Sequence, residues 1–225
     1  MANDIDQIIA DAKSQAKNDQ ILNFINNNLK FIITAIITIL LLIAFIVSYN
    51  IYKSKKNTKY SSLIHQSFIY EQDFDYENAI KPLQEIINSD ARQSIKIIAK
   101  LRYAAILVEQ KEDEKAFNIY HNIAKCTSCD IFIRELSQLL SIKLWINNSK
   151  IYQKEDFKAL IENYAKNAKY LYNNINEQLA IIEKNNKNWQ KSYDIFYKIA
   201  NDIEAYGDIK IRAQNYVNKL HQYIK

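Results

Sequence analysis

The sequence predicts an all-α protein in which one N-terminal transmembrane helix precedes an array of antiparallel helical hairpins, an α-solenoid. The chain has 225 residues but a single glycine, Gly207, and a single proline, Pro82. Sheet-rich folds use both residue types at turns and bulges, so their scarcity favours helices. Beyond residue 58, apolar residues also recur at the three- and four-residue spacing of amphipathic helices. We therefore predict a polar N-terminal segment, a transmembrane helix, a juxtamembrane linker and a repeat domain over residues 1–30, 31–52, 53–58 and 59–225.

The predicted transmembrane helix runs from Phe31 to Tyr52. This segment carries no charge, and 18 of its 22 residues are apolar or aromatic. At 1.5 Å per residue it reaches about 33 Å, enough for a hydrocarbon core of about 30 Å. A cleaved signal peptide would have a shorter apolar region followed by a small-x-small site. Val47 to Asn50 offers no such site, so we expect an uncleaved anchor.

The charges bear on partners and on membrane orientation. The net charge of +5 comes from 30 basic and 25 acidic residues that are interspersed along the chain. A nucleic-acid-binding surface needs Lys and Arg gathered on one face, so we expect no nucleic-acid partner. Positive-inside counting favours a cytoplasmic repeat domain, because more lysines follow the anchor than precede it. The lysines compared are Lys53, Lys55, Lys56 and Lys59 after the anchor with Lys17 and Lys30 before it.

Polar turns divide the repeat domain into helices. The first helix is predicted over Lys59–Gln72, and a polar turn at Asp73–Asp75 ends it. The longest break is expected at Asn147–Gln153. The other helices are predicted over Tyr76–Asn88, Ser94–Gln110, Glu114–Lys125, Ile131–Ile146, Lys154–Ala165, Lys169–Asn185, Trp189–Asn201 and Asp208–Ile224.

A spacing repeats along these helices. Three small residues, 37 and 76 residues apart, act as anchors of a buried face, with apolar or aromatic residues one, four, seven and eight positions later. These anchors are Ala79, Ala116 and Ser192. Twelve residues before each anchor stands another small residue, which would let the paired helices approach closely: Ser67, Ala104 and Ala180. A fourth, degenerate unit fits between Ile131 and Ala168, with an apolar face made of Phe157, Leu160, Ile161 and Tyr164.

This spacing resembles the tetratricopeptide repeat, a 34-residue helix pair with small residues at its helix contacts. The chain departs from the repeat by lacking its closing proline and by having isoleucine seven residues after each anchor. An ordinary antiparallel helical array with aligned apolar faces is the alternative. The whole layout is similar to the bacterial inner-membrane family that contains the ancillary subunit of the Sec translocon, including α-proteobacterial variants. The strongest local likeness runs from Ala99 to Ala124.

The resemblance implies a location and a set of partners. It implies a cytoplasmic N-terminus and a periplasmic repeat domain at the bacterial inner membrane, the opposite orientation to the lysine count. It also implies protein partners, namely translocon subunits, periplasmic chaperones or exported client proteins. The alternative function is a cytoplasm-facing, membrane-anchored scaffold for envelope or division machinery. The sequence does not indicate which residues would bind a partner.

The sequence Cys126-Thr127-Ser128-Cys129 is the motif that could support the widest range of chemistry. A Cys-x-x-Cys pair can be a redox centre, half of a zinc site or a local disulfide. A thioredoxin-like centre needs a βαβ setting, and a closed zinc site needs four ligands, whereas only His121 and Asp130 lie close in sequence. A local disulfide suits a periplasmic domain. Two unreacted thiols are the alternative.

No other motif points to catalysis. One glycine cannot build a glycine-rich phosphate loop, and neither Gly-x-Ser-x-Gly nor His-Glu-x-x-His occurs. We therefore expect no enzymatic activity, metal, cofactor or small-molecule substrate. His65, His121 and His221 show no ligand spacing and are expected at the surface or on the flank of a helix, whereas Trp145 and Trp189 are expected to pack between helices.

Overall fold

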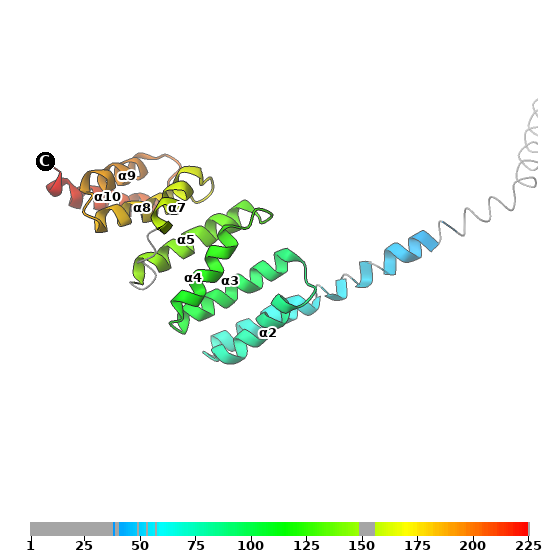
Figure 1. Ribbon diagram of the computed structural model, residues 1–225. Helices are drawn as coiled ribbons and strands as arrows, with labels where there is room; N and C mark the ends of the chain where they lie inside the picture. The colour runs from blue at the N-terminus through cyan, green and yellow to red at the C-terminus, as the bar shows by residue number, and fades with distance from the viewer. Residues whose placement is uncertain are drawn as a thin grey trace, which may run out of the picture. The chain divides into compact units, whose positions relative to one another are not determined.

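The computed structural model describes residues 58–148 and 156–224, together with residue 38 and residues 41–48, 50–52 and 54–56 (Figure 1). Every regular element among these residues is helical, and none is a strand. The prediction of an all-α helical array is therefore confirmed for the described part of the chain. The described residues fall into two compact units, and the division lies between Lys59 and Tyr60.

In the N-terminal unit, residues 41–48 are helical. Each large apolar side chain in this stretch is at least 50% exposed. Residues 31–37, 39, 40 and 49 of the predicted transmembrane helix lie outside the described residues. No helix within the described ranges is both long enough and apolar enough to span a membrane.

The second unit consists of consecutive helices. Residues 60–72 are helical and lead into α2. Most helices pack on the next helix in the chain. The exception is α5, which packs more extensively on α4 and on α8 than on α7. The labelled elements are α2 (Tyr76–Asn88), α3 (Gln93–Glu109), α4 (Asp113–Ala124), α5 (Ile131–Asn147), α7 (Asp156–Asn167), α8 (Tyr172–Asn185), α9 (Trp189–Asn201), α10 (Gly207–Leu220) and the 3₁₀ helix η1 (His221–Tyr223).

Three hairpin turns share one backbone conformation. Phe74, Lys111 and Lys187 have φ values of 57°, 63° and 62°, in the left-handed region. In each turn the next N–H donates to the carbonyl five residues earlier, at 2.8 to 2.9 Å. This is the Schellman arrangement that ends helices, here built without glycine. The three residues each stand five positions before a repeat anchor, so the turns follow the predicted repeat spacing.

The predicted packing residues lie at helix contacts. None of the six exposes any surface: Ser67, Ala79, Ala104, Ala116, Ala180 and Ser192. The Ser192 hydroxyl donates to the Ala180 carbonyl oxygen at 2.8 Å, so these positions of α8 and α9 touch directly. Small side chains at both positions are what permits this approach, because a larger one would hold the backbones apart.

The degenerate unit differs at the same two positions. Trp145 on α5 and Phe157 on α7 are twelve residues apart and buried, and their ring centroids lie 5.7 Å apart. Phe157 also meets Phe117 of α4, with centroids 5.1 Å apart. Two large rings where other hairpins have alanine or serine keep α5 and α7 from packing along their length.

The start of α8 differs from the prediction. The helix was expected from Lys169 but begins at Tyr172. The Glu135 carboxylate, buried on α5, accepts hydrogen bonds from the backbone N–H groups of Lys169, Tyr170 and Leu171, each at 2.8 Å. These contacts fix the turn before α8, because a distant carboxylate satisfies the three N–H groups of that turn. Local sequence could not predict a cap supplied 34 residues upstream.

Candidate functional site: a pocket beside a disulfide

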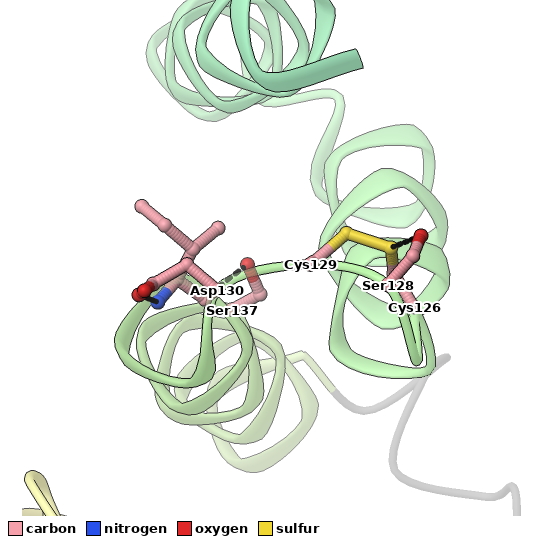
Figure 2. The surroundings of a disulfide bond; sticks show 6 residues. Cys126, Ser128, Cys129, Asp130 and Ser137 are labelled. Carbon is pink, nitrogen blue, oxygen red and sulfur yellow. Dashed lines mark hydrogen bonds between the residues drawn. A yellow bond between two sulfur atoms is a disulfide. The ribbon is translucent and has the colours of Figure 1, made fainter.

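Cys126 and Cys129 form a disulfide in the structure, with their Cα atoms 5.4 Å apart. Figure 2 shows the bridge between the end of α4 and the turn that leads into α5. The Ser128 hydroxyl lies 3.6 Å from the Cys126 sulfur. Asp130 then caps α5, because its Oδ1 accepts hydrogen bonds from the backbone N–H groups of Phe132 and Ile133. The bridge therefore ties the end of one helix to the start of the next.

The bridge borders a pocket of about 280 Å³, which we call the α3–α4 pocket. Ile97, Ile123 and Cys129 are buried and pack together at its wall. The other lining residues come from the end of α2, from α3 and from α4 or the turn after it: Ile87, Gln93, Lys100, Tyr103, Ile119, Asn122 and Cys126. A mainly apolar concavity of this size suits one large apolar side chain of a ligand.

The charge of this pocket is one-sided. Lys100 is half-buried at its wall, and no acidic residue lines it. No carboxylate in the described ranges pairs with Lys100. An ammonium group with no counter-charge, next to apolar walls, favours a ligand that carries a negative charge beside its apolar group.

The other residues singled out from the sequence lie apart from this pocket. His121 is half-buried on α4, and its ring stacks on that of Phe117 with centroids 5.4 Å apart. His65 and His221 are exposed and are not brought together with it. Within the described residues, no group of three or more His, Cys, Asp or Glu side chains could hold a metal ion.

Both tryptophans pack against other rings. Trp145 is buried among core residues that include Ile142 and Ile161. Trp189 is half-buried and stacks on Tyr223, with centroids 4.8 Å apart. Neither tryptophan lines the α3–α4 pocket.

Sequence reasoning missed the residues that line the pocket, above all Lys100 and Asn122. A pocket arises where several helices meet, and the periodicity of one helix does not specify that meeting. The repeat spacing was the one available signal, because it identifies which positions of two hairpins are equivalent.

Comparison of the chain with known protein families, with curated proteins and with solved structures gives no match. The family resemblance described above therefore depends on the sequence pattern alone.

Proposed function

We propose that the chain is a membrane-tethered protein-interaction module whose α3–α4 pocket receives an apolar side chain of a partner protein. The observation that carries this proposal is the open, mainly apolar pocket of about 280 Å³ between packed helices. Protein interfaces concentrate their binding energy in such pockets, where a partner side chain is fully desolvated. Stacked helical hairpins commonly serve binding, because each pair needs neighbours to cover its apolar face and the stack leaves an extended surface.

A tetratricopeptide-like identity of the repeats is part of this proposal. Small residues stand at both helix contacts of three hairpins, and all six are buried. The three left-handed turns at Phe74, Lys111 and Lys187 follow the same 37- and 76-residue spacing. Two independent features, side-chain size and backbone conformation, thus support one repeating unit.

The membrane tether is supported by the described part of the predicted anchor. Residues 41–48 are helical, and their large apolar side chains are exposed. Apolar surface is disfavoured in water by about 25 cal/mol per Å², so lipid is the natural cover for such a helix. Alkaline carbonate extraction tests the tether, and the full-length protein should stay in the membrane pellet. Its release would contradict the proposal.

A matched variant makes this extraction sharper. Changing both Leu42 and Ile46 to aspartate places charges in the proposed anchor. Each charge disfavours membrane insertion by about 2.5–3.5 kcal/mol, so this variant should be released by carbonate. Equal retention of both proteins would mean that another segment holds the chain in the pellet.

The proposed partners are the Sec translocon and periplasmic chaperones that receive newly exported proteins. The Cys126–Cys129 bridge supports a periplasmic domain, because disulfides persist in oxidising compartments. Chemical crosslinking at native expression level should recover translocon subunits, and recovery of none would remove this version of the proposal. Protease should cleave the repeat domain in intact spheroplasts.

The lysine excess after the anchor favours the second candidate, a cytoplasm-facing scaffold for envelope or division machinery. Membrane orientation separates the two candidates. Protection of the repeat domain from protease in spheroplasts, together with free thiols on Cys126 and Cys129, would favour the scaffold.

A further inference from the structure

A second pocket lies at the same place in another repeat. This pocket, of about 370 Å³, is formed by α8 and α9, and we call it the α8–α9 pocket. Six of its lining residues stand 76 residues after six that line the α3–α4 pocket, which is the spacing of the anchors Ala116 and Ser192. The equivalent pairs are Ile97 with Asn173, Lys100 with Asn176, Ile119 with Ile195, Asn122 with Lys198, Ile123 with Ile199 and Cys126 with Asp202.

The two pockets also share their chemistry. The two second-helix isoleucines are retained in both. Lys100 and Asn122 face the α3–α4 pocket from the first and second helix, and Asn176 and Lys198 face the α8–α9 pocket with the two residue types exchanged. Each pocket thus combines an isoleucine pair with one ammonium group and with carboxamide groups, which come from Gln93 and Asn122 in the first pocket and from Asn173, Asn176 and Asn201 in the second.

The first hairpin has a tyrosine where the other two hairpins have Ile97 and Asn173. Tyr60 stands 37 residues before Ile97, at the equivalent point of the first repeat. Its ring is buried against Leu83 and Ile86, and its hydroxyl donates to Asp90 Oδ1 at 2.9 Å. A tyrosine is larger than the isoleucine or the asparagine at this position of the other two hairpins, so the same ring placed there would take up part of each pocket.

We propose that both pockets bind the same class of ligand, an extended segment of a partner protein in which an aliphatic side chain lies next to a carboxylate. The aliphatic group would pack on the isoleucine pair, and the carboxylate would meet Lys100 or Lys198. Asn122 offers both a donor and an acceptor, which matches a peptide group. Asn176 offers its side-chain oxygen, because its Nδ2 already donates to the carbonyl oxygens of Ala165 and Tyr172. This inference rests on the proposed function and adds to it a ligand class and a second site.

The α8–α9 pocket is also lined by one carboxylate, that of Asp202. Its Oδ2 accepts a hydrogen bond from Asn173 at 2.8 Å and its Oδ1 accepts one from the Glu204 backbone N–H at 2.9 Å. No described carboxylate, Asp202 included, forms an ion pair with Lys198. The ammonium group is therefore available to an incoming carboxylate.

The test counts bound peptides. The full-length protein is placed in phosphatidylcholine nanodiscs and titrated calorimetrically with the peptide Gly-Glu-Leu-Glu-Gly-Ser. A second peptide, with lysine in place of both glutamates, tests the charge requirement. We expect about two acidic peptides per chain, and binding of the lysine peptide weaker by at least about tenfold.

Matched variants assign the two sites. Ile97→Tyr and Asn173→Tyr copy the residue that fills the first hairpin, so each should leave about one bound peptide and the double variant none. Asn215→Tyr, on the exposed face of α10, should leave both sites intact. Should a tyrosine variant fail to fold, Lys100→Glu and Lys198→Glu test the same sites, and each should weaken binding at one site by about tenfold.

Three results would overturn the inference: no binding of the acidic peptide, a stoichiometry that neither tyrosine variant changes, or equal binding of the lysine peptide. Native crosslinks of the full-length chain to partner proteins separate this inference from the proposed function. If those crosslinks persist while the peptides do not bind, the inference fails and the proposed function stands.

Discussion

The hairpins α3–α4 and α8–α9 share a backbone plan but not the chemistry that stabilises it. Both have small residues at the helix contacts and a left-handed residue in the turn. At one buried position the two hairpins differ in polarity. Leu107 in α3 corresponds to Glu183 in α8, 76 residues later. The repeat therefore specifies side-chain size and turn conformation, whereas the polarity of the core is free to vary between copies.

Glu183 is held by a network of partners. Its carboxylate accepts hydrogen bonds from Lys191 Nζ at 2.8 Å and from Asn188 Nδ2 at 2.6 Å, and Lys158 Nζ lies 3.5 Å away. Burial raises the pKa of Glu183, but the hydrogen bonds from Lys191 and Asn188 outweigh it, so the pKa lies below its ordinary value. Lys191 also pairs with Glu162 of α7 at 2.8 Å. The α3–α4 hairpin relies instead on apolar contacts and the adjoining disulfide.

Removing Glu183 should have the largest effect. Glu183→Ala leaves a cavity and removes the hydrogen bonds from Lys191 and Asn188, so we expect a loss of about 2–4 kcal/mol in the free energy of unfolding. Glu183→Leu introduces the residue of the other hairpin and should lose less, because leucine refills the cavity while the half-exposed Lys191 keeps Glu162 as its partner. Urea unfolding followed by tryptophan fluorescence measures both. Equal losses would show that the two hairpins are not interchangeable at this position.

Enlarging the shared helix contacts should affect both hairpins alike. Ala116→Leu and Ser192→Leu each place a larger side chain where no surface is exposed, at a cost of about 1–3 kcal/mol. Asn215→Leu, on an exposed face, serves as the control and should leave the unfolding midpoint unchanged. A loss in only one of the two hairpins would argue against a common contact.

Removing the disulfide should have a smaller and local effect. Replacing both Cys126 and Cys129 by serine opens a loop of only four residues, so the loss should be at most about 2 kcal/mol. Hydrogen exchange should quicken at the end of α4 and the start of α5 and stay unchanged in α8 and α9. Faster exchange throughout the repeat domain would contradict this separation.

Lowering the pH should destabilise the α8–α9 hairpin and leave the α3–α4 hairpin unaffected, whereas loss of the disulfide acts on the end of α4. The folded pKa of Glu183 lies below its ordinary value, so the stabilisation it provides is fully present above the unfolded pKa and is lost as the pH falls through the folded pKa. The buried Tyr120 of α4 has its pKa raised to about 12 by burial and does not titrate in acid. Protection factors from hydrogen exchange, followed as the pH is lowered stepwise from neutral through the acid range, should therefore show α8 and α9 losing protection before α3 and α4. Simultaneous loss would remove Glu183 as the cause.

Features set within one helix could be predicted from the sequence, whereas contacts between distant segments could not. Helix positions and the buried faces followed from apolar spacing, and α2 and α9 have the predicted bounds. These features are local, because one helix and its own periodicity determine them. The cap that Glu135 supplies to the turn before α8 joins residues far apart in sequence and could not be read from either segment.

The sequence did not predict the pockets for a related reason. Their walls come from several helices, so no single periodic pattern marks Lys100 or Lys198 as pocket residues. The aromatic pair Trp145 and Phe157 was likewise visible only as apolar positions, although it decides how loosely α5 and α7 pack. Equivalence between repeats is the one sequence signal that connects such distant positions.

Site-specific photocrosslinking in cells tests most directly whether the repeat domain binds other proteins through these pockets. A benzoylphenylalanine residue is introduced in place of Gln93, which lines the α3–α4 pocket, of Asn201, which lines the α8–α9 pocket, or of the exposed Asn215 of the full-length chain. We expect discrete adducts with partner proteins from positions 93 and 201, reduced by Ile97→Tyr and Asn173→Tyr respectively, and none from position 215. Equal adducts from all three positions, or adducts that persist in both tyrosine variants, would contradict binding at the pockets.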